Sequence, residues 1–454
     1  MRYFGLLKYS GFIIVYSLLI IFLTGCNNES AKEFSTHITI IGDKWYFNDR
    51  IINEGSPAEG LLMNVRMVNT LFEDRSGQLN KVVPDFDPVT STKVFTGIIP
   101  EYVSNGINAF TISLQGGNPG YEGAINTAFN PDGSLRESYM ERAEKVIRAC
   151  DANNAAVNLS LFYQRQHSHQ KALTGKESII NAVENTAGWI AEKGFTNVIL
   201  EISNEYRHSG FRRWVDGDWL TSEDGQAELI RRAKNRNPDL LVSTSGMGDG
   251  RFHETLAREA DFILIHFNHT WLDEIPSRIK DLKKYGKPIL CNEDEKLGRE
   301  AAVSQALSVL NGSGWGFMYL RKNQWAPFIF SGADDDPEVY GMYRNITSPG
   351  YQIDHEALVK PYIYMGYPGQ GDVFLMGQPV YIKLYHLFPD RATNHNIKLL
   401  VNDEYVTRVD DELKLYWNPE THGIYELEAV VNDQDGNELY RSPKTAIFVH
   451  RDRR

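Results

Sequence analysis

Two glutamates follow apolar, strand-like runs in the middle of this sequence of 454 residues. Glu205 comes directly after Asn204, past a run that begins at Val198, and Glu293 follows a second run that begins at Pro288. Two carboxyl groups can act together as a general acid and a nucleophile. One, protonated, donates its proton to a leaving oxygen, while the other, ionised, attacks carbon. We therefore predict that the two glutamates meet at one site, although either motif alone would also fit a surface residue.

Glu201 and Glu295 lie close to these two motifs and compete with them for the same roles. Glu201 has the strand parity of Glu205 but lies deeper in its strand, whereas Glu295 comes later and fits a loop. Glu205 and Glu293 are therefore the stronger candidates.

Other polar and aromatic side chains follow or interrupt further strand-like runs. His266 ends an apolar run, and Arg66 is a charge inside another, where it requires a partner such as a carboxylate. The alternatives are a buried core histidine at 266, ordinary loop structure for the polar residues, and core packing for the tryptophan at 315. As substrate-binding candidates beside Asn204 we take Arg66, Gln115, Tyr163, Gln164, His266, Asn268, Trp315 and Trp325.

Short apolar runs alternate with amphipathic stretches over residues 61–320, which is typical of βαβ units with a parallel sheet. The eight predicted strands are Leu61–Val68, Ala109–Leu114, Ala156–Phe162, Val198–Ile202, Leu240–Ser245, Phe262–His266, Pro288–Asn292 and Gly316–Leu320. Apolar residues at helical spacing predict helices at Ser138–Asp151, Glu177–Lys193, Glu223–Asn235, Leu272–Tyr285 and Arg299–Leu310. Eight strands close a (β/α)8 (TIM) barrel, whose active sites lie at the carboxyl ends of the strands. An open doubly wound sheet is the alternative, but no glycine-rich phosphate loop follows these runs.

The segments on either side of this series have other patterns. Residues 38–53 contain turn signals at Gly42-Asp43 and Asn48-Asp49, and we expect a hairpin that caps the bottom of the barrel. After residue 365, short β-type runs alternate with turns, which predicts a small all-β sandwich. The expected domains are thus an α/β barrel over residues 38–365 and a sandwich over residues 366–454.

The order of strands and strand-end motifs resembles the clan of retaining glycosidases that includes the family five cellulases, which carry Asn-Glu after strand four and Glu after strand seven. The resemblance covers most of residues 38–330, and residues 366–454 resemble immunoglobulin-like modules of secreted glycosidases. It implies that Glu205 is the acid/base, that Asn204 contacts the sugar 2-hydroxyl, and that Glu293 is the nucleophile. Asp294 departs from the pattern, since a small or aromatic residue usually follows the nucleophile, so a different glycone pocket is expected. Family members often place an arginine from the second strand beside the nucleophile. Arg66 departs from this pattern, because it lies in the first predicted strand.

The resemblance implies a retaining glycoside hydrolase that acts on a poly- or oligosaccharide. The competing hypothesis is a surface lipoprotein that binds glycan through the barrel and sandwich without catalysis. Two intact glutamate motifs favour the enzyme, because a degenerate barrel would be expected to have lost one of them. Transglycosylation on the same two residues is not separated from hydrolysis by the sequence.

The first 26 residues contain a basic start, a short apolar run and the sequence Leu23-Thr24-Gly25-Cys26. This pattern is typical of an export signal, and its end resembles a bacterial lipobox, in which the cysteine is acylated after cleavage. We expect a signal peptide over residues 1–25, lipidation of Cys26, a polar tether over residues 26–37, and a bacterial cell-envelope location. A plain secretory signal or an uncleaved helix is the alternative.

Composition argues against several other classes of function. The net charge is −12 and no Lys/Arg tract follows the first 26 residues, so nucleic acid is not an expected partner. The scattered histidines lack the spacing of a zinc site, and Asp334-Asp335-Asp336 fits a solvated loop better than a calcium site. We expect no metal and no cofactor. The expected partners are the glycan substrate and, through the lipid anchor only, a membrane.

Overall fold

The computed structural model describes residues 34–77, 79–81, 83–116, 124–166, 173–389 and 394–451. The predicted signal sequence and Cys26 lie outside the described residues. Among the described residues, no helix combines the length and the hydropathy that a membrane crossing requires.

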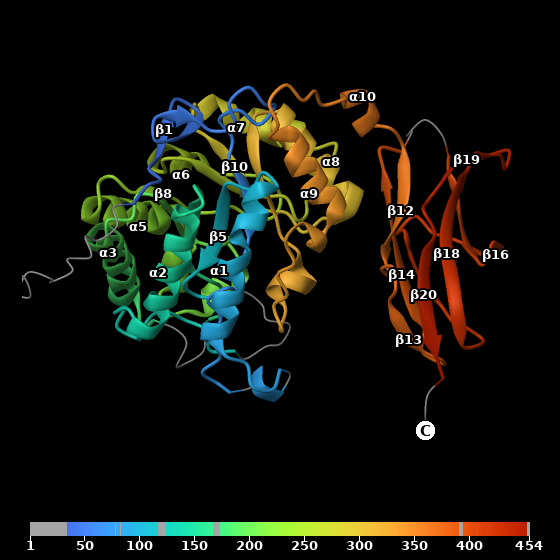
Figure 1. Cartoon of the computed structure of the whole chain (residues 1–454), viewed down its shortest axis with the longest axis horizontal. Helices are drawn as coiled ribbons and strands as arrows, with labels where there is room; N and C mark the ends of the chain where they lie inside the picture. The colour runs from blue at the N-terminus through green and yellow to red at the C-terminus, as the bar shows by residue number, and fades with distance from the viewer. Residues whose placement is uncertain are drawn as a thin grey trace, which may run out of the picture.

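Eight parallel strands form the central sheet of the first domain (Figure 1). They are β4 (Met63–Arg66), β5 (Ala109–Ser113), β6 (Ala156–Phe162), β7 (Val198–Ser203), β8 (Leu241–Ser243), β9 (Ile263–His266), β10 (Ile289–Glu293) and β11 (Ser313–Phe317). The last strand pairs with the first, and a parallel bridge between Ser245 and Leu264 joins β8 to β9. The sheet is therefore a nearly closed barrel, and the predicted fold class is confirmed.

The eighth strand lies three residues earlier than predicted, at Ser313–Phe317 rather than Gly316–Leu320. Gly312, with φ of 81°, ends the preceding helix and allows the chain to enter the sheet at once. A side chain at Gly314 would meet the backbone oxygen of Leu62 at 2.3 Å, so small residues are required where the strand approaches its neighbour. The prediction was wrong because these small residues do not read as an apolar strand.

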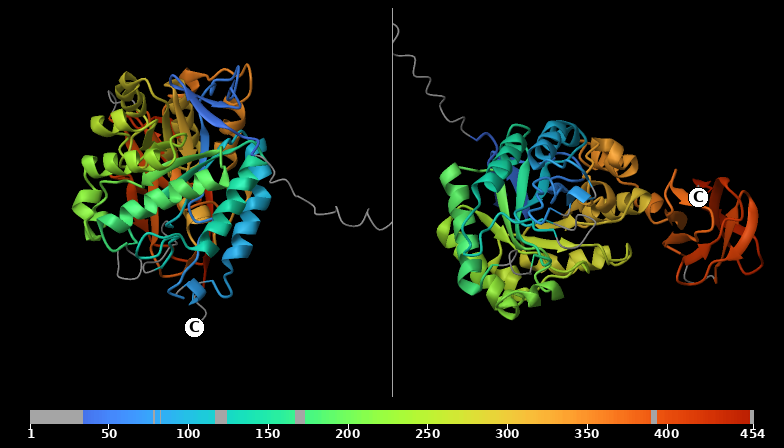
Figure 2. Two further views of the ribbon diagram at one scale, coloured as in Figure 1. Left: turned by 90° about the vertical axis from the view of Figure 1, so that its left-hand side faces the viewer. Right: turned by 90° about the horizontal axis from the view of Figure 1, so that it is seen from below.

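Helices surround the strands (Figure 1, Figure 2). All five predicted helical intervals contain one: α2 (Glu137–Asp151), α3 (Lys176–Lys193), α5 (Glu223–Arg236), α7 (Ile275–Leu282) and α8 (Gly298–Leu310). Helices α1 (Pro88–Ser104) and α9 (Pro337–Ile346) were not predicted, although Asp87 and Asp336 cap them and a proline follows each cap. Shorter elements are η1 (Leu79–Lys81), η2 (Ser209–Arg213), α4 (Gly217–Leu220), α6 (Glu254–Glu259), η3 (Lys283–Tyr285), η4 (Leu320–Gln324), η5 (Gly332–Asp335) and α10 (His355–Leu358).

A small three-stranded sheet covers the end of the barrel where the strands begin. It consists of β1 (Ile38–Ile41), β2 (Lys44–Phe47) and β3 (Arg50–Ile51). Trp45 packs edge-to-face on Phe262 with ring centroids 5.3 Å apart, within an apolar cluster that contains the first residues of several barrel strands. This end of the barrel is therefore closed by apolar packing, and the opposite end is left for a site.

The C-terminal domain consists of two β-sheets around a separate apolar core. One sheet has the order β12 (Tyr362–Tyr367), β14 (Val380–Leu387), β17 (Lys414–Trp417). The other has the order β13 (Val373–Leu375), β20 (Thr445–His450), β18 (Gly423–Asn432), β15 (Asn396–Val401), β16 (Glu404–Arg408), and β19 (Glu438–Arg441) pairs with β18. The predicted domain boundary between residues 365 and 366 falls within β12.

The sheet β12-β14-β17 lies on the side of the sandwich nearer the barrel (Figure 1). The Tyr364 hydroxyl donates a hydrogen bond of 2.6 Å to Glu300 Oε2 in α8. The neighbouring Arg299 donates to the backbone oxygen of Ala357 at 3.2 Å, and its guanidinium lies 4.8 Å from the ring centroid of Tyr362. Polar and cation–π contacts thus join the two domains along α8.

Candidate active site

Glu205 lies in the sharp turn that follows β7, at the end of the barrel opposite the small sheet. Its φ of 51° places it in the left-handed region, which is sparsely populated by residues other than glycine. Two hydrogen bonds hold this turn. The backbone N–H of Glu205 donates to Ser245 Oγ at 2.8 Å, and the backbone oxygen of Glu205 accepts from the His208 N–H at 2.7 Å. Such backbone strain is commonly found at functional sites.

Glu293 is the last residue of β10 and is buried. Each of its carboxylate oxygens has a donor. Oε2 lies 2.7 Å from Nε of Arg66 in β4, and Oε1 accepts a hydrogen bond of 2.6 Å from Nδ2 of Asn268, which follows β9. Two donors on separate oxygens favour an ionised carboxylate with a fixed orientation.

His266, the last residue of β9, lies between the two glutamates. Its Nδ1 is 3.5 Å from Oε1 of Glu205 and 3.6 Å from Oε2 of Glu293. One carboxylate oxygen of Glu205, one of Glu293 and a ring nitrogen of His266 all lie within 4.8 Å of one another. The two predicted glutamates therefore meet at one site, although they are 88 residues apart in the sequence (293 minus 205).

The neighbours of Glu293 and His266 shift the pKa values of these two side chains in opposite directions. Burial raises the pKa of Glu293, but Arg66, His266 and the hydrogen bond from Asn268 outweigh burial and hold that pKa below its ordinary value. Burial lowers the pKa of His266, but Glu293 and Glu205 outweigh burial and raise that pKa above its ordinary value. Both shifts favour the charged forms, a carboxylate at Glu293 and an imidazolium at His266.

Arg66 connects Glu293 to the first of the two motifs. Its Nη2 donates a hydrogen bond of 2.6 Å to Oδ1 of Asn204, and its Nη1 lies 3.9 Å from Oε2 of Glu201. Glu201 is completely buried below the site, where it also accepts a weak hydrogen bond from Asn292 at 3.4 Å. Arg66 thus has the carboxylate partner that its buried position requires, although it comes from the first strand of the barrel.

Glu295 is exposed and lies outside the group formed by Glu205, His266 and Glu293. Asp294, which departs from the expected motif, is completely buried and accepts hydrogen bonds from Ser304 Oγ at 2.6 Å and Trp315 Nε1 at 3.0 Å. Because these partners belong to α8 and β11, Asp294 anchors the strand end to its surroundings. These hydrogen bonds account for an aspartate at the position after Glu293, where the resemblance led us to expect a small or aromatic residue.

Trp315 does not belong with the substrate contacts. It is completely buried in β11, with its ring 6.1 Å from that of Phe317 and 5.6 Å from that of Tyr343. Because β11 begins three residues earlier than predicted, Trp315 lies in the middle of the strand rather than just before it. The core-packing alternative holds for Trp315.

The remaining predicted contacts form a second layer or stay apart from the glutamates. Gln164 Oε1 accepts a 3.4 Å hydrogen bond from Asn204 Nδ2, and Gln115 Oε1 accepts one of 3.0 Å from the Tyr163 N–H. Burial raises the pKa of the Tyr163 hydroxyl. Trp325 follows η4, and its buried indole N–H has no hydrogen-bond partner among the described residues. Gln115 therefore holds the backbone that follows β6, whereas the indole N–H of Trp325 is left without a partner among the described residues.

Ser245 is a residue of the site that the sequence did not single out. It follows β8 and holds the backbone of Glu205. Its only signal in the sequence is a place among small polar residues at the end of a predicted strand, Ser243-Thr244-Ser245. Such a run is common at the end of any barrel strand, so a structure was needed to identify its partner.

Glu205, His266 and Glu293 are close enough to offer three ligand atoms to a metal ion. The charges around them fit this poorly. Both oxygens of Glu293 already accept from Arg66 and Asn268, and the raised pKa of His266 favours a protonated ring, which is not a metal ligand. The donor set suits proton transfer and nucleophilic chemistry better than metal binding.

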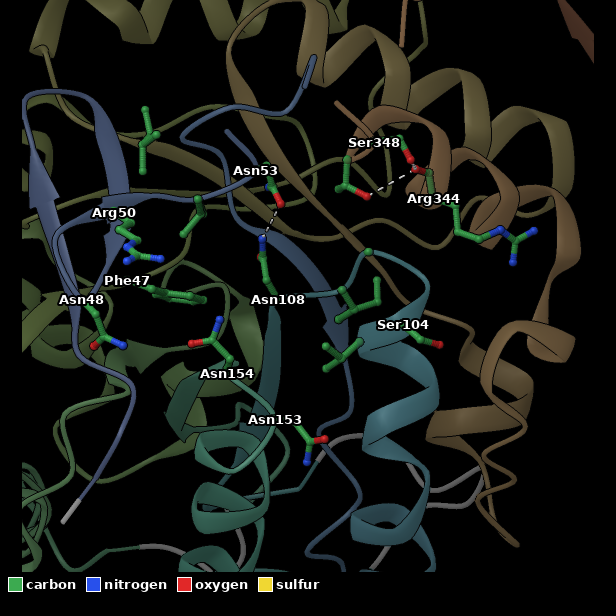
Figure 3. Close-up of a pocket in the computed structure, with 16 residues that line it drawn as sticks. Phe47, Asn48, Arg50, Asn53, Ser104, Asn108, Asn153, Asn154, Arg344 and Ser348 are labelled. Carbon is green, nitrogen blue, oxygen red and sulfur yellow. Dashed lines mark hydrogen bonds between the residues drawn. The ribbon is translucent and has the colours of Figure 1, made fainter. Parts of the chain in front are cut away.

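A broad pocket of about 920 Å³ lies at the other end of the barrel, beside β2 and β3 (Figure 3). Several of its polar side chains, among them two amides, are used in the fold. Asn53 Nδ2 donates to the Leu61 oxygen at 2.9 Å, Asn108 Oδ1 accepts from the Met63 N–H at 2.7 Å, and the two amides bond each other at 3.3 Å. Despite its size, the pocket contains no paired carboxylates.

Residues 90–255 match the family model for Cellulase (glycosyl hydrolase family 5). The barrel is cellulase-like. This match confirms the resemblance predicted from the strand-end motifs and supports a glycoside hydrolase. None of the curated proteins matches the chain.

Solved structures of glycosidases are similar to this cellulase-like chain at low identity. A family 5 enzyme from Prevotella bryantii B14 is 11% identical, with a TM-score of 0.47, over 68% of this chain and 100% of its own. A broad-specificity endoglucanase from Clostridium longisporum is 12% identical, with a TM-score of 0.45, over 65% and 99%. A β-glucuronidase from Bacteroides uniformis is 11% identical, with a TM-score of 0.43, over 92% and 48%. The chain thus spans about half the length of that β-glucuronidase, and these scores carry no argument about activity.

Proposed function

We propose that the protein is a retaining glycoside hydrolase that cleaves glycosidic bonds in a poly- or oligosaccharide by double displacement. The observation that supports this proposal is the separation of the two carboxylates, whose nearest oxygens lie within 4.8 Å of one another. Retaining glycosidases hold their carboxyl groups about 5–5.5 Å apart, whereas inverting enzymes need roughly 6.5–9.5 Å to admit a water molecule. The shorter spacing favours attack by a side chain.

Glu293 is the nucleophile in this proposal. Arg66, Asn268 and His266 keep it ionised and fix its oxygens, so that one of them can attack the anomeric carbon. Glu205 donates a proton to the leaving oxygen and then takes a proton from the water that hydrolyses the glycosyl-enzyme. Asn204, oriented by Arg66 and Gln164, contacts the sugar 2-hydroxyl.

The test is to follow hydrolysis by proton NMR and to separate the two glutamates with azide. The first-formed product of the wild-type enzyme should keep the anomeric configuration of the substrate. Glu205→Gln should retain turnover of aryl glycosides with good leaving groups, and azide should give a glycosyl azide of retained configuration. Glu293→Gly with azide should give the inverted azide. An inverting wild-type enzyme, or full activity of both variants on the natural glycan, would show that the assignment is wrong.

We also propose a location in the bacterial cell envelope with a lipid anchor at Cys26. The support is the sequence Leu23-Thr24-Gly25-Cys26 after a short apolar run. Cys26→Ser should release the protein from membranes or block its maturation. If the variant still sediments with membranes at the mature size, Cys26 is not the anchor.

A further inference from the structure

Three tyrosines form a row across one sheet of the C-terminal domain. Tyr367 is the last residue of β12, Tyr381 lies in β14, and Tyr416 lies in β17. Tyr381 and Tyr416 are paired across the two strands, with ring centroids 5.2 Å apart, and the centroids of Tyr367 and Tyr381 are 6.0 Å apart. The planes of these pairs are inclined by 46° and 34°. The three rings form one continuous, gently twisted aromatic surface.

The same face of this sheet has a second group of tyrosines, which contacts the barrel. Tyr362, Tyr364 and Tyr385 stack at 5.9 and 5.2 Å, and Tyr364 bonds to Glu300 of the barrel. The row Tyr367-Tyr381-Tyr416 is less covered: Arg321 of the barrel contacts Tyr367, but Tyr416 is 68% exposed and the other two rings are partly exposed. Cross-strand ring pairs stabilise a sheet, but that role does not require a large aromatic ring to remain in water. A contiguous patch of exposed apolar surface is a feature of interaction sites.

The row continues toward the active-site end of the barrel. The guanidinium of Arg321 lies 4.9 Å from the ring centroid of Tyr367. Arg321 belongs to η4, which follows β11, and Gln324 of the same segment donates a hydrogen bond of 2.5 Å to the backbone oxygen of Arg66. One short segment therefore contacts both the arginine that holds Glu293 and the first ring of the row.

We propose that Tyr367, Tyr381 and Tyr416 form an accessory platform that binds a stretch of the glycan chain away from the bond that is cleaved. The proposal rests on the proposed function, because it takes the ligand to be the same polysaccharide. Sugar rings present flat C–H faces between equatorial hydroxyls, and tyrosine offers an apolar ring with a hydroxyl that hydrogen-bonds at its edge. Arg321 and the exposed Lys383, which donates a hydrogen bond to the Tyr385 hydroxyl, add donors for sugar oxygens beside the row.

The test uses the soluble form, residues 27–454, which lacks the proposed lipid anchor and carries Glu293→Gln so that bound polymer is not consumed. Its retardation in native gels that contain β-glucan, xylan, mannan or a sulfated host glycan gives an affinity for each polymer. Tyr416→Ala in this background should weaken binding to the retarding polymer by about five- to tenfold, the loss expected for one aromatic contact. Tyr416→Trp should keep or strengthen binding, because it preserves the ring.

Tyr405→Ala is the matched control. Tyr405 is 62% exposed and lies in β16 of the other sheet, so its loss removes a similar exposed ring from the same domain. Retardation of this variant should equal that of the parent. Thermal unfolding of all variants shows whether a change in binding follows from a change in folding. If folded Tyr416→Ala binds every polymer as the parent does, or if Tyr405→Ala loses as much, the platform is wrong.

Cleavage by the wild-type chain, assayed beside the binding of the Glu293→Gln chains, separates failure of the platform from failure of the proposed function. A chain that cleaves no glycan but is retarded by one, with the loss confined to Tyr416→Ala, would keep the platform and remove the enzyme. A chain that cleaves glycan with retention and shows no dependence on Tyr416 would keep the enzyme and remove the platform. Absence of retardation by every polymer, in a folded chain, would overturn the platform directly.

Discussion

The two ends of the barrel are both rich in polar side chains, but they use them differently. At the end where the strands begin, amides such as Asn53 and Asn108 bond to backbone groups and to each other around a broad pocket. At the end where the strands finish, the ionisable side chains of Glu293, His266 and Arg66 are buried against one another. There, buried polar atoms such as His266 Nε2 and Asn268 Oδ1 have no partner among the described residues.

This difference shows that the volume of a cavity does not locate the chemistry. A pocket whose polar groups complete the fold has little bonding capacity left for a ligand. A cluster of buried charges with unused donors and acceptors costs stability in the free protein and is retained where a ligand or a reaction uses it. The strained backbone of Glu205 lies at the same end of the barrel.

The largest effect is expected from Glu293→Gln. The variant should lose activity by several orders of magnitude, because an amide cannot form the glycosyl-enzyme and no other carboxylate of the described residues is placed to replace Glu293. Glu295→Gln is the matched control: this neighbouring glutamate is exposed, and its removal should change kcat/KM little. Steady-state kinetics on one aryl glycoside compare the two variants. Equal losses would mean that the nucleophile had been assigned to the wrong glutamate.

Arg66→Met should reduce both stability and activity. Removal of the guanidinium leaves Glu293 and Glu201 buried without their cation, which typically costs about 3–5 kcal/mol of the free energy of unfolding. The exposed pair Arg258–Glu254 is the control, and Arg258→Met should change the free energy of unfolding far less, because solvent screens this pair. Urea unfolding measures both. Adding Glu201→Gln to Arg66→Met should restore part of the stability, and a further loss instead would contradict the charge argument.

His266 should make stability depend on pH within a defined window. Because its pKa is raised in the folded protein, its contribution is fully present below its unfolded pKa of about 6.5 and is lost as pH rises through the folded value. The pKa of Glu293 is lowered, so the contribution of Glu293 is present above about pH 4.5 and is lost as pH falls through the folded value. Together, the two contributions are complete between roughly pH 4.5 and 6.5.

His266→Gln should remove the decline in stability above pH 6.5, which amounts to about 1.4 kcal/mol for each unit by which the pKa is raised. The measurement is the difference in unfolding free energy between wild type and variant from pH 5 to 9. His253→Gln, at a histidine whose side chain is 43% exposed, is the control. A difference that stays constant with pH would mean that His266 is not held in its charged form.

The parts of the fold that could be predicted from the sequence are those with strong apolar periodicity. The first seven strands were found within a few residues of their places, because buried parallel strands read as continuous apolar runs. The eighth strand was misplaced because Ser313 and Gly314 are small for packing reasons that a sequence does not reveal. Helix α1 was missed although Asp87 and Pro88 signal its start, since Pro100 lies inside it and the exposed Val89 and Val94 add apolar residues to its outer face.

Of the candidate site, too, one part could be predicted from the sequence and another part could not. The positions of Glu205 and Glu293 at strand ends could be predicted, since a barrel brings the carboxyl ends of its strands together. The need of Arg66 for a carboxylate partner could also be predicted, but not that this partner is Glu293. Ser245 has no distinctive neighbours in the sequence, and Trp315 packs in the core. Which strand-end residues touch depends on register and strand length, and neither is encoded in one local motif.

The smallest effects are expected at the opposite end of the barrel, and they test whether the two ends are separate. Arg50→Ala removes a side chain that lines the broad pocket (Figure 3) and should change neither kcat/KM nor, beyond about 0.5 kcal/mol, the free energy of unfolding. Asn53→Ala should cost about 1–3 kcal/mol, because it leaves the buried Leu61 oxygen without its donor. Its activity per folded molecule should equal that of the wild type. Urea unfolding combined with active-site titration measures both quantities. Should either substitution alter kcat in protein that is fully folded, the pocket takes part in the reaction and the contrast between the two ends does not hold.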